Sequence, residues 1–130
     1  MKNILLSITS LISLYVLALL FFNYYEQPSS RFSNYDELAA SGLIERGWVP
    51  EYLPKSITNI EEQHDLDTNW VRMSFSYNPD KTNITDDDCN LLVGNVMGKK
   101  YICKPFEGVT ALLILMNNGK GYYKSDYERL

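Results

Sequence analysis

The strongest constraint in this sequence is an apolar segment near its start. Residues 4–22 carry no charge and consist mainly of leucine, isoleucine and phenylalanine. As a helix rising about 1.5 Å per residue, this segment reaches about 28 Å, close to the thickness of a bilayer's hydrocarbon core. Tyr24 and Tyr25 follow it, as aromatic residues do at membrane interfaces. The sequence therefore predicts one transmembrane helix from Ile4 to Phe22.

The residues that flank this segment predict its orientation and whether it is cleaved. Lys2 and the terminal amine are the positive charges on the short side, so the amino end is expected to stay in the cytoplasm. A cleavable signal peptide has a shorter apolar region and a small-residue cleavage site, whereas residues 21–25 are bulky. We therefore expect residues 1–25 to be a membrane anchor, with a signal sequence as the alternative. The protein would be a single-pass protein of the inner (cytoplasmic) membrane, with its C-terminal domain periplasmic or extracellular.

The rest of the chain has the size and composition of one small exported domain. Pro28 and the serines beside it predict a stalk over residues 26–33, and residues 34–130 suffice for a single core. Residues 26–130 carry 16 acidic side chains and 11 lysines or arginines, a net charge of −5. The basic residues are scattered along the sequence, which argues against nucleic acid or an anionic membrane surface as a partner.

Two short helices are predicted from caps and spacing. Asn34 with Glu37 resembles a capping box, and Gly42 is a plausible left-handed stop for this first helix. A second helix is predicted to begin at Thr85 and to end at Gly98. Its apolar side would contain residues at helical spacing, namely Cys89, Leu92, Val93, Val96 and Met97.

Alternating residues and turn formers predict two hairpins. Residues 71–77 alternate between apolar and polar, and Asp65–Asn69 supplies turn formers before them. The irregular spacing of Ile57 and Ile60 indicates a bulge in the preceding strand. Residues 109–116 form a β-compatible apolar run followed by an Asn-Gly turn and a returning strand. The resulting expectation is an α+β fold: an antiparallel sheet of about four to five strands in two hairpins, two short helices, and one transmembrane helix before them.

Two features are predicted to stabilise this domain. The prolines of residues 47–54 prevent a regular element, so this segment should form a rigid corner that packs Trp48 against the core. Cys89 and Cys103 are the only cysteines. In an oxidising compartment they are expected to form a disulfide, with two free buried thiols as the alternative. Closing a loop of about 15 residues would stabilise the fold by roughly 3 kcal/mol.

The sequence contains few groups that could perform catalysis or bind a metal. His64 is the only histidine, no nucleophile motif is present, and His and Cys together are too few for a zinc site. Asp65–Asn69 resembles the start of a calcium loop, but Trp70 and Ser76 occupy the positions that require glycine and glutamate. We therefore predict no metal, no cofactor and no catalytic residue. The candidate binding residues are Trp48, His64, Asp65, Asp67 and Asn69.

Four short motifs suggest a family. They are Gly47-Trp-Val-Pro50, Leu53-Pro54-x-Ser56, Ile60-x-Glu62 and His64-Asp-Leu-Asp-Thr-Asn69. Together they resemble the signature of a family of small uncharacterised bacterial envelope proteins, over residues 34–77. The resemblance implies a bacterial envelope location and one domain behind an exported or lipid-anchored start, and it implies no activity. This chain lacks a lipidation cysteine, and Ile57 stands where a smaller residue is expected.

These observations predict a membrane-anchored envelope protein that binds another protein and is not an enzyme. An immunity-type inhibitor and an accessory subunit of an envelope complex both fit. One alternative is a small hydrolase-like enzyme that uses His64 with Asp65 or Asp67 as acid–base groups. The other is a domain that binds a small ligand or a glycan in a groove lined by tyrosines.

Overall fold

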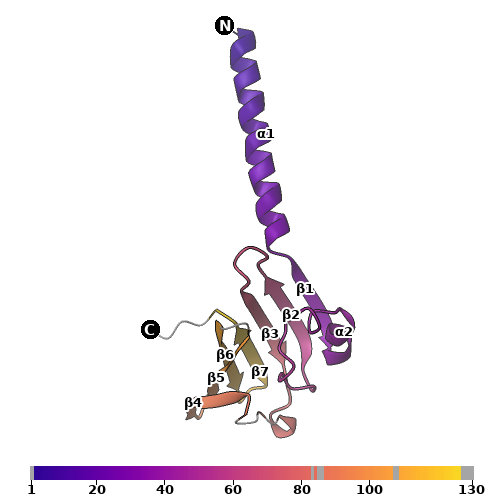
Figure 1. Ribbon diagram of the computed structural model, residues 1–130, viewed down its shortest axis with the longest axis vertical. Coiled ribbons are helices and arrows are strands. Elements are labelled where there is room, and N and C mark those ends of the chain that lie inside the picture. The colour runs from indigo at the N-terminus through magenta and orange to yellow at the C-terminus, as the bar shows by residue number, and fades with distance from the viewer. Residues whose placement is uncertain (1, 83, 85–86, 107–108, 127–130) are drawn as a thin grey trace.

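Seven antiparallel strands form one sheet, and a long helix extends away from it (Figure 1). The computed structural model describes residues 2–82, 84, 87–106 and 109–126. The sheet order is β1-β2-β3-β7-β6-β5-β4, so β1 and β4 are its two edges. The helical elements are α1 (Lys2–Glu26), α2 (Tyr35–Ala40) and the 3-10 helix η1 (Pro79–Lys81). The strands are β1 (Ser29–Asn34), β2 (Thr58–His64), β3 (Val71–Ser76), β4 (Cys89–Asn95), β5 (Gly98–Phe106), β6 (Val109–Met116) and β7 (Lys120–Lys124).

This architecture corrects the predicted fold class. The domain is mostly β, with seven strands where an α+β fold with four to five strands was expected. The prediction of a transmembrane helix is contradicted as well, because within the described residues no helix has both the length and the apolar character needed to cross a membrane. Residues 26–33, expected as a stalk, contain most of β1, in which Ser29 pairs with Gln63 of β2.

The predicted second helix is also wrong. Residues 89–95 form β4, which pairs with β5, and the expected helix start at Thr85 lies outside the described residues. The reason is the position of β4 at the edge of the sheet. Leu91, Leu92 and Val93 are all exposed, so no buried face imposes alternation on this strand. The apolar residues could therefore fall at helical spacing by coincidence.

Local signals near the start of the domain are confirmed. The Asn34 side chain accepts a hydrogen bond from the Glu37 N–H at 3.0 Å, and the Glu37 carboxylate accepts one from the Ser33 N–H at 2.7 Å. The first bond satisfies a free N–H group at the start of α2, and the second satisfies the N–H of the residue before the cap. Gly42 has φ +74°, the left-handed conformation expected of a helix stop.

The predicted strand irregularity and both predicted turns are present. The β2–β3 register shifts between Thr58 and Glu61, where Asn59 has φ +49°. The segment Asp65–Asn69 turns the chain from β2 into β3. In the β6–β7 hairpin, Gly119 has φ +79° and its N–H donates to the Met116 carbonyl at 3.0 Å.

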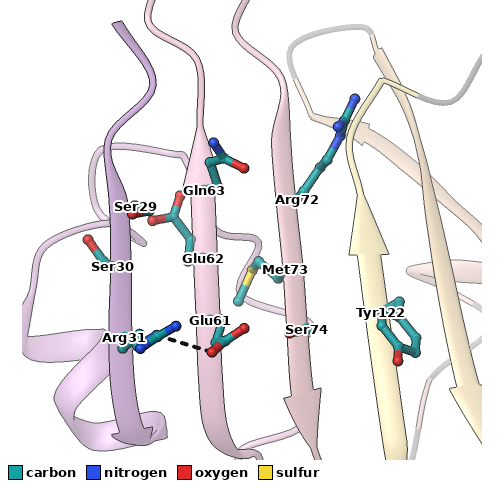
Figure 2. A pocket seen from close by; sticks show the side chains of 10 residues that line it. All are labelled: Ser29, Ser30, Arg31, Glu61, Glu62, Gln63, Arg72, Met73, Ser74 and Tyr122. Atoms are coloured by element: carbon teal, nitrogen blue, oxygen red, sulfur yellow. Dashed lines mark ion pairs between the residues drawn. The ribbon is translucent and has the colours of Figure 1, made fainter. Parts of the chain in front are cut away.

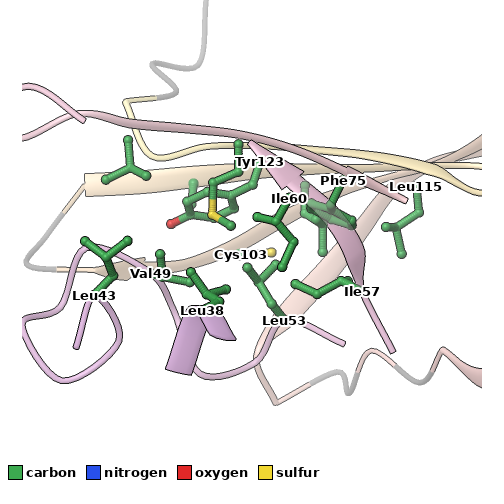
Figure 3. Packing of buried hydrophobic residues seen from close by; sticks show 14 of the residues in the cluster. Leu38, Leu43, Val49, Leu53, Ile57, Ile60, Phe75, Cys103, Leu115 and Tyr123 are labelled. Atoms are coloured by element: carbon green, nitrogen blue, oxygen red, sulfur yellow. The ribbon is translucent and has the colours of Figure 1, made fainter. Parts of the chain in front are cut away.

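The hydrophobic core lies on one face of the sheet and is covered by α2 and residues 41–57 (Figure 3). Leu38 of α2 is fully buried, and residues 41–57 add Leu43, Val49, Leu53 and Ile57 to the core beneath the strands. This covering segment makes backbone hydrogen bonds of its own, such as Trp48 N–H to Leu43 O at 2.9 Å. The buried apolar residues are Leu38, Leu43, Val49, Leu53, Ile57, Ile60, Val71, Met73, Phe75, Cys89, Cys103, Ala111, Leu113, Leu115 and Tyr123.

A glycine in β7 makes room for a core ring. Gly121 pairs with Phe75 of β3, and a Cβ at residue 121 would overlap the Phe75 ring. We expect Gly121→Ala to lower the free energy of unfolding by about 1–3 kcal/mol, because the ring must leave its packed position. Urea denaturation measures this. Gly94→Ala is the matched control: its Cβ would meet nothing nearer than Leu91 Cδ2 at 3.9 Å, so an equal loss there would contradict the explanation.

Candidate functional site

Two of the predicted binding residues meet beneath the sheet. Gly47, with φ +81°, turns the covering segment so that Trp48 reaches the end of β2. The Trp48 ring then stacks on the His64 ring, with 4.3 Å between centroids and 27° between planes. His64 is 7% exposed, so this contact encloses the only histidine of the chain.

The partner of His64 is Glu62, a residue that sequence reasoning did not single out as functional. His64 Nδ1 lies 2.7 Å from Glu62 Oε1, and Glu62 is 1% exposed. Burial raises the pKa of Glu62, while His64 and Arg46 act in the opposite direction. Its second oxygen, Oε2, has no hydrogen-bond partner within the described part of the chain. A signal for this pair was present, because Ile60, Glu62 and His64 alternate along one strand and so share a face.

The acidic candidates have a different role. Asp65 Oδ1 accepts hydrogen bonds from the N–H groups of Asp67 and Thr68 at 3.0 and 2.8 Å, and from the Thr68 hydroxyl at 2.8 Å. Its Oδ2 accepts one from Gln27 Nε2 at 3.0 Å. The Thr68 bonds are the main reason that the pKa of Asp65 is lowered. Asn69 completes the turn with φ +56°. Asp65 is therefore the organising residue of the β2–β3 turn.

The candidates thus separate into two groups with different surroundings. Trp48 and His64 lie together with Glu62 inside the domain, whereas Asp67 and Asn69 are exposed at the turn. In the described residues, no group of three or more His, Cys, Asp or Glu side chains is placed to hold a metal ion. The buried carboxylate–imidazole pair can share a proton, but it presents little surface to a substrate.

The other face of the sheet forms a surface that sequence reasoning missed. We call it the open face and define it by cross-strand pairs. One row contains Arg31, Glu61, Ser74, Tyr122, Ile114 and Lys100, and the next contains Gln63, Arg72, Lys124, Leu112 and Ile102. Ser76 and Lys120 form a third pair. Because directly paired residues point to the same side of a sheet, these side chains share one surface. It lies opposite the covered core.

A hollow of about 540 Å³ occupies the β1–β2–β3–β7 half of the open face (Figure 2). Figure 2 shows Arg31, Glu61, Arg72 and Tyr122 standing on the near side of the strands, while Met73 points behind them. Tyr122 is 45% exposed although it is a large aromatic residue. The lining residues are Ser29, Ser30, Arg31, Glu61, Glu62, Gln63, Arg72, Met73, Ser74 and Tyr122.

The open face is basic although the chain is acidic overall. The pairs that define it contain five cations and one carboxylate. That carboxylate, Glu61, lies 3.1 Å from Arg31 in an exposed ion pair, and Asp126 lies 3.1 Å from Lys124, so three of the five cations are outside these two pairs. Arg72 lies over the Trp70 ring, 4.4 Å from its centroid, which holds the guanidinium in place. Folding therefore collects basic residues that are scattered in the sequence. The cations are Arg31, Arg72, Lys100, Lys120 and Lys124.

The cysteines form the predicted disulfide. Cys89 of β4 and Cys103 of β5 are directly paired across the two strands, and their sulfur atoms are bonded. The bridge fastens the edge strand β4 to the rest of the sheet. No free cysteine is present in the described chain.

Comparison with known proteins gives one partial match. Residues 26–76 match the family model described as the YbbD head domain. The match includes β1, α2, the covering segment, β2 and β3, and so contains Trp48, Glu62 and His64. No curated protein and no solved structure matches the chain. Residues 26–76 are thus similar to the YbbD head domain, and this similarity supports the resemblance to a family of small bacterial envelope proteins.

Proposed function

We propose that this protein is a non-catalytic protein-binding module of the bacterial envelope. Its domain would lie outside the cytoplasm, and the exposed apolar side chains of α1 would associate with the cytoplasmic membrane. Its open face would bind an acidic surface of another envelope protein. The observation that carries the proposal is this uncovered, hollowed and basic face on a chain whose net charge is −4.

Two features support the location. The disulfide between Cys89 and Cys103 is of the kind that persists in oxidising compartments such as the periplasm. The large apolar side chains of α1 are exposed, including Leu11 at 67% and Phe21 at 64%, and an apolar surface of this size needs a nonpolar neighbour. A membrane supplies one.

The composition of the open face supports a protein partner. Its β6 and β5 part contributes Leu112, Ile114 and Ile102, which are partly buried, next to the charged part around Arg72. Apolar contact area bordered by charged groups is typical of protein interfaces. The cations favour an acidic partner, because complementary charge speeds association and disfavours partners of the same sign. An immunity-type inhibitor and an accessory subunit would both use such a surface.

The enzyme alternative receives less support from the geometry. His64 is buried and bonded to Glu62, and Asp65 is occupied by its turn. The glycan alternative requires several tyrosines around one hollow. Tyr122 is the one tyrosine that lines the described hollow on the open face, whereas Tyr123 belongs to the core.

Photo-crosslinking in living cells tests the binding face. A photoreactive amino acid in place of Tyr122 should form adducts with a specific envelope protein, because this side chain stands on the open face. The same amino acid in place of Glu51, which is exposed on the covering segment, should not form them. Equal adducts at both positions, or none at Tyr122, would contradict the proposal.

Charge reversal then tests the chemistry of binding. With the crosslinked partner in hand, Arg72→Glu should raise its Kd at least about tenfold, because a favourable charge becomes a repulsive one. Lys55→Glu, the same reversal on the exposed covering segment, is the matched control and should leave the Kd nearly unchanged. The wild-type Kd should also rise with salt. A Kd insensitive to both Arg72→Glu and salt would exclude the basic face as the binding surface.

A further inference from the structure

The edge strand β4 has an unusual surface for an exposed sheet edge. Residues 89–98 contain no charged side chain. The apolar side chains there are strongly exposed: Leu91 at 54%, Leu92 at 41%, Val93 at 50%, Val96 at 93% and Met97 at 77%. Soluble proteins usually protect an edge with charges, prolines or β-bulges, because its free N–H and C=O groups can pair with another strand. β4 has no charge and no proline, and its one such feature is a register shift against β5 between Leu91 and Val93.

The opposite edge of the same sheet shows the usual protection. β1 has the sequence Ser-Ser-Arg-Phe-Ser-Asn, in which Arg31 is exposed and Phe32 is partly buried. The chain therefore protects one edge and leaves the other apolar. This difference argues that β4 is covered by something in the working protein.

The backbone of β4 is held ready for pairing. The Cys89–Cys103 disulfide ties it to β5, and the Lys104 N–H donates to the Asp88 carbonyl at 2.8 Å. In an antiparallel ladder, successive residues alternate in the direction of their N–H and C=O groups. Because Asp88 directs its carbonyl toward β5, Cys89 and Leu91 direct these groups away from β5. These groups face the open edge. A strand fixed in advance loses little conformational freedom when a partner strand pairs with it.

The charges that flank β4 favour a second copy of this chain in antiparallel orientation. Asp87 precedes the strand, and Lys99 lies on β5 beside Gly94, near the other end of β4; both are exposed. Antiparallel pairing about a two-fold axis near Leu92 brings the acidic end of one copy toward the basic end of the other. Such an interface uses the same patch twice and closes on itself. Parallel pairing would place like charges together.

We propose that β4 is a homodimer interface: β4 strands of two copies pair in antiparallel fashion and join the two sheets into one continuous sheet. The exposed side chains of Leu91, Leu92 and Val93 then pack across the axis. The open face extends to β4 through the Val93–Lys100 pair, but pairing at the edge does not cover it, and the hollow lies among β1, β2, β3 and β7. The dimer is therefore independent of the partner proposed above.

The test is sedimentation of the full chain in a mild detergent. Wild-type protein should form dimers as its concentration is raised to about 100 μM, because even a weak interface is populated at that concentration. Val93→Lys should raise the dimer Kd at least about tenfold, because it places two like charges near the axis. Ser33→Lys adds the same charge to the exposed edge β1 and should leave the dimer unchanged. Unchanged circular dichroism shows that both variants fold.

A charge exchange tests the antiparallel orientation separately. Asp87→Lys alone and Lys99→Asp alone should each weaken the dimer, and the double variant should restore it. A wild-type chain that is monomeric throughout, or a dimer unaffected by Val93→Lys, would overturn the proposal. Hydrogen exchange provides another contradicting outcome. If the β4 amides become protected only when a different protein is added, that protein and not a second copy binds the edge.

Discussion

Replacing His64 by alanine is expected to lower the free energy of unfolding by about 3–5 kcal/mol at pH 7, because the buried Glu62 carboxylate loses its hydrogen-bond partner. The other carboxylate oxygen already lacks one in the described structure. The change also removes the stacking on Trp48, worth about 0.5–1.5 kcal/mol in itself. Urea denaturation followed by tryptophan fluorescence measures the loss. A catalytic His64 would instead be removable with little change in stability.

The size of this loss should depend on pH in a defined direction. Burial raises the pKa of Glu62 above its ordinary value of 4.5, so the folded protein binds the proton more tightly than the unfolded chain. The tighter proton binding by Glu62 stabilises the fold. This contribution is fully present below pH 4.5 and is lost as the pH rises through the pKa of Glu62 in the folded protein. Without His64, the ionised Glu62 carboxylate also lacks its hydrogen-bond partner. The His64→Ala loss should therefore be smaller at pH 4 than at pH 7.

Glu62→Gln provides the matched control. Glutamine keeps the size of the side chain and cannot ionise, so this variant should lack the decline in stability above pH 4.5 that Glu62 causes. In a double-mutant cycle, His64→Ala should cost less in the Glu62→Gln background, because no charge is left unpaired. If His64→Ala costs the same at both pH values and in both backgrounds, the contact between Glu62 and His64 does not stabilise the fold.

Local sequence signals predicted local structure well in this protein. The Asn34 cap, the Gly42 stop, the Asp65–Asn69 turn and the Gly119 turn each depend on backbone and side-chain chemistry within a few residues, and each is present. The strand Val71–Ser76 alternates because one side of it is buried. Signals of this kind do not need the rest of the fold.

Features that depend on strand order were not predictable in the same way. The spacing from Cys89 to Met97 favoured a helix. The apolar residues of β4 do not alternate because the strand lies at an edge and its register against β5 shifts between Leu91 and Val93. The predicted disulfide was an argument against the helix, because it places Cys89 opposite Cys103 on a neighbouring strand. The basic open face has no sequence signature at all. Arg31, Arg72 and Lys124 lie far apart in the chain and meet because β1, β2, β3 and β7 are neighbours.

Replacing both cysteines by alanine is expected to lower the free energy of unfolding by about 3 kcal/mol. The bridge closes a loop with a sequence separation of 14 residues, and the chain-entropy model assigns roughly this value to a loop of that length. The bridge also holds β4, which has a neighbouring strand on one side only. We therefore expect the amides of β4 to exchange with solvent faster in Cys89→Ala/Cys103→Ala, whereas those of β3, in the sheet interior, should change less.

Reduction separates the bridge from the side chains themselves. A reducing agent should destabilise the wild-type protein by about the same 3 kcal/mol and should leave the double-alanine variant unaffected. Because the bridge holds β4, the dimer should also be weaker in the reduced wild-type protein and in the double-alanine variant than in the oxidised wild-type protein. A double variant as stable as the oxidised protein would show that β4 keeps its place on β5 without the covalent link. The edge strand would then be pre-organised by the β4–β5 hydrogen bonds and by the turn at Asn95 alone. In that turn the N–H groups of Met97 and Gly98 donate to the Asn95 side chain at 2.9 and 3.2 Å.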